Sequence, residues 1–184
     1  ERGGSYLLGA ELEIDRVHVG LFTSDLYIKD IKLYNPPGFP EKVMVDMPKI
    51  YMDYTWRKLF RGEIYLTELT LNLKEFNVCK NSEGEVNLNS LKPIKDKASA
   101  EDIQEKDKGK GPKITIEVLN LKAKQLTFSD YSKGRSPKVR TYKLDIDESY
   151  RYIDDPDTLT RLVVARVLQN TAIANIVQIP MNGV

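Results

Sequence analysis

The sequence holds few of the residues from which catalytic and metal sites are built. Its 184 residues include one cysteine, Cys79, and one histidine, His18. A single cysteine excludes a disulfide within the chain and any zinc or iron–sulfur site that needs several cysteines. A single histidine removes most metal sites and catalytic triads, because both need further partners. No glycine-rich phosphate loop or nucleophile elbow is found, so we predict no enzymatic activity and no cofactor.

An excess of one charge and a long apolar run are also lacking. The 28 Lys and Arg residues nearly balance the 27 Asp and Glu residues, which disfavours binding to nucleic acid through bulk charge. No run of about 18 strongly apolar residues is present, so we expect no helix of this sequence to cross a bilayer. The sequence begins at Glu1, and we expect a natural product that starts upstream. A removed signal peptide and a membrane anchor would both fit.

Five segments share one apolar pattern, in which two residues alternate, two positions are skipped, and two more residues alternate. They are Leu12, Ile14, Val17, Val19; Leu26, Ile28, Ile31, Leu33; Val45, Met47, Ile50, Met52; Ile64, Leu66, Leu69, Leu71; and Ile116, Val118, Leu121, Ala123. Alternation predicts strands with one buried face. A skip of two would turn every later side chain to the opposite face, so we expect a bulge or bend at each skip.

Bent strands with one continuous apolar face predict a strongly curved antiparallel β-sheet of about six to eight strands, with a last strand over Val139–Ile146. Its concave side would form a groove that holds lipid or other apolar groups. The residues expected to line this groove are Ile14, Val17, Ile28, Ile31, Ile50, Met52, Leu66, Leu69, Val118 and Leu121. An ordinary β-sandwich, with a second sheet on this face, is the alternative. Residues 1–155 would form this domain, with 92–113 as a mobile charged insertion.

The last part of the chain changes to helical spacing. Asp155 suits an N-cap and Pro156 the first helical position, which predicts a long apolar helix over 156–179, before Pro180. After Arg166 no charged residue follows, so the helix would pack on the sheet, cap the groove or dock on another chain. Docking would make the protein a structural or accessory subunit of a larger complex or a homo-oligomer. The docking residues would be Val163, Val167, Leu168 and Ile176.

The polar candidates for function are few. His18 lies between two residues of the apolar pattern and should point away from that face. Asp145 and Asp147 alternate, as a cation site or an acid/base pair would require, but carboxylates on a strand's polar face are usually solvated. Aromatic and cationic residues alternate around Trp56, Lys58, Phe60 and Arg61. This stretch suits a structural connection, and of two functional alternatives, stacking on nucleic acid and contact with a membrane surface, we prefer the membrane surface.

Residues Gly9 to Leu91 resemble the N-terminal module of the bacterial AsmA-like family, which includes TamB-type envelope proteins. The resemblance rests on a strand that leads into the turn Asn35-Pro36-Pro37-Gly38-Phe39, on the strands over 48–54 and 64–71, and on the glycine turn followed by Asn87-Leu88. The stretch 114–128 is similar to the next element of the family.

This resemblance implies a non-enzymatic protein on the periplasmic side of a bacterial membrane. It implies a curved β-groove related to those of bridge-like lipid-transport proteins, and an N-terminal anchor outside this sequence. Membrane lipids would be its ligands. Because the chain has one groove segment and one helix, the resemblance favours a small version that binds lipid locally, oligomerises, or serves as an accessory subunit.

Overall fold

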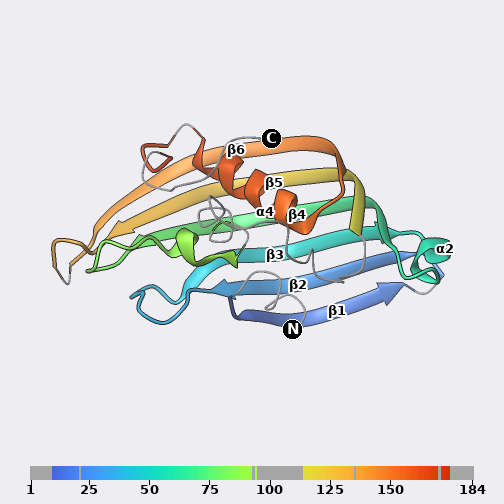
Figure 1. The fold of residues 1–184 in the computed structure, drawn as a ribbon, viewed down its shortest axis with the longest axis horizontal. Coiled ribbons are helices and arrows are strands. Elements are labelled where there is room, and N and C mark those ends of the chain that lie inside the picture. The colour runs from blue at the N-terminus through green and yellow to red at the C-terminus, as the bar shows by residue number, and fades with distance from the viewer. Residues whose placement is uncertain are drawn as a thin grey trace, which may run out of the picture.

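The computed structural model describes residues 10–20, 22–92, 94, 114–134, 136–169 and 171–174. Six strands form one sheet in chain order (Figure 1): β1 Leu12–Gly20, β2 Asp25–Tyr34, β3 Val43–Tyr54, β4 Ile64–Lys80, β5 Ile114–Asp130 and β6 Lys138–Ile153. Strands β1 and β6 lie at its two edges, so the sheet does not close. A helix, α4 (Pro156–Leu168), follows β6. The prediction of a mainly β chain with a C-terminal helix is confirmed.

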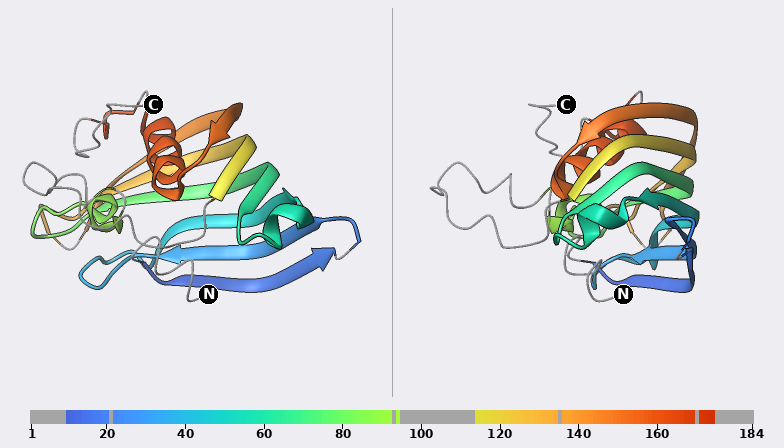
Figure 2. Two further views of the ribbon diagram at one scale, coloured as in Figure 1. Left: turned by 45° about the vertical axis from the view of Figure 1, so that its right-hand side comes forward. Right: turned by 90° about the vertical axis from the view of Figure 1, so that its right-hand side faces the viewer.

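The sheet is curved, and α4 lies against its concave side (Figure 2). Register explains how each strand keeps one apolar face through the bend. Ile14 pairs with Ile31 and Arg16 with Lys29, so the register of β1 and β2 is the same on both sides of the skipped positions. Asp30 adopts a left-handed φ of 52° at the skip in β2, which only Gly, Asn and Asp tolerate at little cost. The bend between these two strands therefore needs no extra residue, because the skipped positions of β1 lie opposite those of β2.

The sheet is mixed, so the prediction of a purely antiparallel sheet is wrong. Strands β4 and β5 pair in parallel, with Leu69 beside Leu119 and Leu73 beside Ala123. The pairing has a constant offset of fifty positions, and the two strands repeat one apolar pattern. Parallel pairing requires a connection of a dozen residues or more. The chain between Lys80 and Ile114, which contains the charged segment 92–113, has the length for this return; residues 95–113 themselves lie outside the described part.

Helix α4 is shorter than the predicted helix over 156–179. It begins as expected, because the Asp155 carboxylate accepts a hydrogen bond from the Thr158 N–H at 2.8 Å. It ends at Leu168, whose carbonyl accepts bonds from the Thr171 hydroxyl at 2.6 Å and from the Thr171 N–H at 3.0 Å. These bonds satisfy a terminal carbonyl group and stop the helix. Among the described residues, no helix is long and apolar enough to cross a membrane.

Short helices lie between the strands. Helix α2 (Trp56–Leu59) connects β3 to β4, and the 3-10 helix η1 (Asn87–Ser90) follows β4. Asn87 is fully buried and its side chain makes three hydrogen bonds: it donates to the side-chain oxygen of Asn35 at 2.7 Å and to the Asn77 carbonyl at 2.8 Å, and it accepts from the Cys79 N–H at 3.0 Å. The Asn35 turn after β2 is thus fastened to the end of β4. The two asparagine motifs that carry the family resemblance meet in space.

Candidate functional site

The apolar faces of all six strands are joined into rows that run across the sheet. In one row Val17 pairs with Ile28, Ile28 with Ile50, Ile50 with Leu71, and Leu71 with Leu121. The exposed fraction falls along the row: Val17 is 56% exposed, Leu71 is 9% exposed and Leu121 is completely buried. The row therefore begins at an open edge and ends in the core.

The β4–β6 half of this face is covered by α4. The predicted groove residues Leu66, Leu69 and Leu121 are buried there in one cluster with side chains of the helix. The predicted docking residues Val163, Val167 and Leu168 belong to the same cluster, so within this chain they contact its own sheet. A partner would reach them only if α4 left the sheet. Ile176, the fourth predicted docking residue, lies outside the described residues.

An ion pair fastens α4 to strand β6. Arg166 Nε donates to Glu148 Oε2 at 2.5 Å, and a second guanidinium nitrogen bonds to the other carboxylate oxygen. The Tyr150 hydroxyl also donates to Glu148, at 2.6 Å. The hydrogen bond from Arg166, followed by that from Tyr150, lowers the pKa of Glu148 to about 2. Burial, and then the bond to Glu148, raises the pKa of Tyr150 to about 12. Glu148 is thus a positioning residue for the helix.

The β1–β3 half of the same face is more open. Ile14, Ile28, Ile50 and Met52 are half-buried, and Val17 is the most exposed of the predicted groove residues. Towards the end where Tyr34 pairs with Val43, these strands are buried as well: Ile31, Leu33, Met44 and Val45 are 5% exposed or less. Val19, which belongs to the first repeat but not to the predicted groove lining, is also exposed and pairs with Leu26 at the end of β1. This half of the concave face is the candidate apolar binding surface, which we call the open groove (Ile14, Val17, Val19, Leu26, Ile28, Ile50 and Met52).

Val118 does not lie in the core, where the sequence pattern put it. Val118 is half-buried and pairs with Glu68 and Arg151, whereas its neighbour Leu119 is fully buried and pairs with Leu69. The skip in β5 therefore comes before Leu119. Both residues are apolar, so alternation alone favours neither phase. The offset of fifty positions from β4 would have identified Leu119, because Leu119 takes the place of Leu69.

The predicted membrane-surface residues lie at one end of the sheet, on α2 and the turn after it (Figure 1). Phe60 is 85% exposed and stacks on Trp56, with ring centroids 6.2 Å apart. Arg61 is exposed, whereas Lys58 pairs with Glu63 at 3.0 Å. The exposed residues Leu59 and Arg57 complete this surface.

Phe22, which was not among the predicted membrane-surface residues, also belongs to this surface. Phe22, in the turn between β1 and β2, is fully exposed. The backbone N–H of Tyr54 donates to the Ser24 carbonyl at 2.9 Å, so the Phe22 turn lies beside the end of β3, from which α2 starts. We call these residues the apolar tip (Phe22, Trp56, Leu59, Phe60, with Arg57 and Arg61). A lone phenylalanine in a turn has no periodicity that could have revealed it.

The remaining polar candidates are not brought together. His18 is exposed and pairs with Tyr27, off the apolar row as predicted. Asp145 is exposed with a left-handed φ of 46°, and Asp147 pairs with Lys122 at 3.1 Å. Among the described residues, no group of three His, Cys, Asp or Glu side chains could hold a metal ion. Cys79 is buried, and burial raises the pKa of its thiol.

Comparison with known proteins adds no relative. No family model, no curated protein and no solved structure matches the chain.

Proposed function

We propose that the chain is a non-enzymatic module that shelters acyl chains or similar apolar groups in the open groove. The observation that carries this proposal is the uneven cover of one continuous apolar face. The helix α4 covers the β4–β6 half, whereas the same rows reach Val17 and Val19 with side chains about half exposed. Contiguous exposed apolar surface on a soluble domain is typical of a binding site.

The curved sheet suits an extended apolar ligand. A row such as Val17, Ile28 and Ile50 presents one branched aliphatic side chain from each of three neighbouring strands, at steps of about 5 Å. Each methylene group that such a surface removes from water contributes about 0.8 kcal/mol. An acyl chain would gain this energy without any polar partner, which agrees with the scarcity of polar groups along the rows.

The proposal is tested by introducing a charge into the open groove. The probe is oleate, measured by displacement of a fluorescent fatty acid from the purified chain. Val17→Asp should weaken oleate binding by about ten-fold or more, because a carboxylate beside an acyl chain must lose its water. Since Val17 is more than half exposed, the variant should keep the wild-type melting temperature.

A matched control is available on the opposite edge strand. Val139 of β6 is 55% exposed, against 56% for Val17 of β1. Val139→Asp therefore makes the same change, at the same exposure, away from the open groove. It should leave oleate binding within about two-fold of wild type. Failure of the wild-type chain to bind oleate, or equal losses in the two variants, would refute the proposal.

The apolar tip supports a membrane location for this activity. Aromatic rings flanked by arginines are the side chains that settle at the boundary between headgroups and acyl chains. We therefore propose that the tip touches a lipid surface and that the chain works at the periplasmic side of a bacterial membrane. The resemblance to AsmA-like proteins supports this location.

The tip is tested by sedimentation with vesicles of phosphatidylcholine and phosphatidylglycerol. Phe22→Ser combined with Phe60→Ser should reduce the bound fraction several-fold, because both rings are exposed and available for insertion. Val139→Ser is the control, as an exposed apolar residue outside the tip. Equal sedimentation of the double variant and wild type would exclude contact through the tip.

A further inference from the structure

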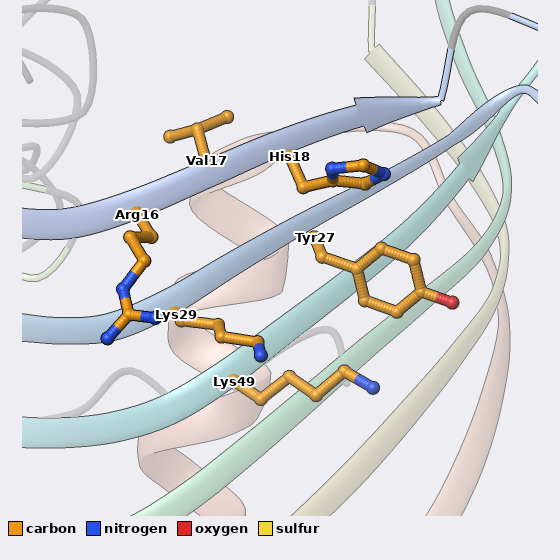
Figure 3. A pocket seen from close by; sticks show the side chains of 6 residues that line it. All are labelled: Arg16, Val17, His18, Tyr27, Lys29 and Lys49. Atoms are coloured by element: carbon orange, nitrogen blue, oxygen red, sulfur yellow. The ribbon is translucent and has the colours of Figure 1, made fainter.

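A row of cations crosses the face of the sheet opposite the open groove. Arg16 of β1 pairs with Lys29 of β2, and Lys29 pairs with Lys49 of β3. Adjacent strands are about 5 Å apart, so three positive charges stand side by side on neighbouring strands. Figure 3 shows the three side chains projecting from these strands. Like charges in directly opposed positions destabilise a sheet, so this arrangement has a cost that a ligand could offset.

The charges of this row are poorly neutralised by the chain. Among the described residues, neither Lys29 nor Lys49 lies within ion-pair distance of a carboxylate. Arg16 contacts Asp15 at 3.1 Å, but both side chains are more than half exposed, and such pairs contribute little. The far end of the same row differs, because Lys122 there pairs with Asp147 at 3.1 Å.

The cations line an open depression of about 480 Å³ together with Val17, His18 and Tyr27. Lys49 Nζ lies 4.5 Å from the centre of the Tyr27 ring, and that ring packs against Tyr51 with centroids 4.9 Å apart. The ring thus holds the Lys49 ammonium group over the depression without neutralising it. Figure 3 shows the Tyr27 ring and Lys49 side by side over this part of the sheet.

We propose that this depression binds the phosphate group of an anionic ligand between Arg16, Lys29 and Lys49. Guanidinium groups bind phosphate oxygens in pairs, and lysines add charge from flexible stems. Three cations in a row can share the oxygens of one phosphate or of two linked phosphates. The three cations lie on the face opposite the open groove, and Val17 on edge strand β1 borders both. The contacts to phosphate come from the cations, so they do not depend on the proposed binding of acyl chains. The phosphate could belong to a small molecule in solution or to a lipid headgroup.

Two probes distinguish these sources. Pyrophosphate, followed by titration calorimetry, tests a soluble ligand. Sedimentation with phosphatidylcholine vesicles, with and without phosphatidic acid, tests a lipid headgroup. Lys29→Gln combined with Lys49→Gln should weaken binding by about ten-fold or more in whichever assay shows binding, because two charge-assisted contacts are lost. Binding should also weaken as salt is raised.

The matched control removes two positive charges outside the depression. Lys32 lies between Glu13 and Asp46, and Lys122 pairs with Asp147, so both already have acidic neighbours. Lys32→Gln combined with Lys122→Gln should keep binding within about two-fold of wild type. A loss confined to the Lys29 and Lys49 variant supports the site. Equal losses in both double variants, or no binding of either probe by wild type, would overturn it.

Discussion

The two halves of the sheet carry the same apolar alternation, but their apolar side chains differ in burial. In β4 and β5 the alternating residues are buried beneath α4, whereas in β1 and β2 their row partners include exposed valines and half-buried isoleucines. Alternation thus specifies which side chains share a face. It does not specify whether another element covers that face, because cover depends on where the chain places its helix. The residues of a row that lie beneath α4 form part of the core. The residues of the same row that extend beyond α4 form a candidate binding surface.

The largest effect is expected from shortening one side chain at each end of a single row. Leu121→Ala should lower the free energy of unfolding by about 3 kcal/mol, because it leaves a cavity beneath α4. Val17→Ala, in the same row, should change it by less than about 0.5 kcal/mol, because Val17 is largely solvated already. Urea unfolding of both variants measures the difference. Similar losses would mean that β1 is as fully packed as β5.

A smaller effect is expected where the two halves are fastened together. Asn87→Ala should destabilise the chain by about 2 kcal/mol, because the buried N–H of Cys79 and the carbonyl of Asn77 lose their partner. Asn89→Ala is the control, since Asn89 lies on the same short helix and is exposed. Thermal unfolding compares them. No difference between the variants would show that the link between Asn35 and Asn87 contributes nothing to stability.

The smallest effect, which depends on pH, is expected at the ion pair between Glu148 and Arg166 that holds α4 against β6. Glu148→Gln should destabilise the chain by about 1 kcal/mol at neutral pH, because the bonds to Arg166 lose their charge. The pKa of Glu148 is lowered to about 2 in the folded chain, against an unfolded value near that of an ordinary glutamate.

The ionised pair stabilises the fold fully above the unfolded value, and this contribution falls as the pH drops towards 2. The stability difference between wild type and the variant should therefore be constant near pH 7 and disappear at about pH 2. Denaturant unfolding at several pH values measures it. A difference that persists at the lowest pH would have a cause other than this carboxylate.

Local sequence patterns predicted the parts of the fold that depend on neighbouring residues. The alternation and the helix start at Asp155 need only a few adjacent positions, and both are found. The skip in β5 was misplaced, because Val118 and Leu119 are both apolar. The parallel pairing of β4 and β5 was missed because it joins segments fifty positions apart. The end of α4 was missed because Thr171, which lies inside the predicted helix over 156–179, bonds to the Leu168 carbonyl.

The candidate site was predicted only in part, because some of its features depend on contacts between segments that are distant in the sequence. The apolar face was visible in the sequence, but its division into covered and open halves rests on the position of α4. Phe22 and the row of Arg16, Lys29 and Lys49 follow from strand register and turn contacts. Charge alternation in single strands gives no sign that three cations will stand in line.

The parallel pair also has a consequence for the order of folding. Strands β1 to β4 pair with their immediate sequence neighbours, so their contacts close short loops. The pairing of β4 with β5 has to bring together segments separated by the whole stretch between Lys80 and Ile114. Contacts between distant segments slow folding, because loop entropy is lost before they form. We therefore expect the open half to be present early and the covered half to complete the native state last, as φ-values at Ile31 of β2 and Leu121 of β5 would reveal.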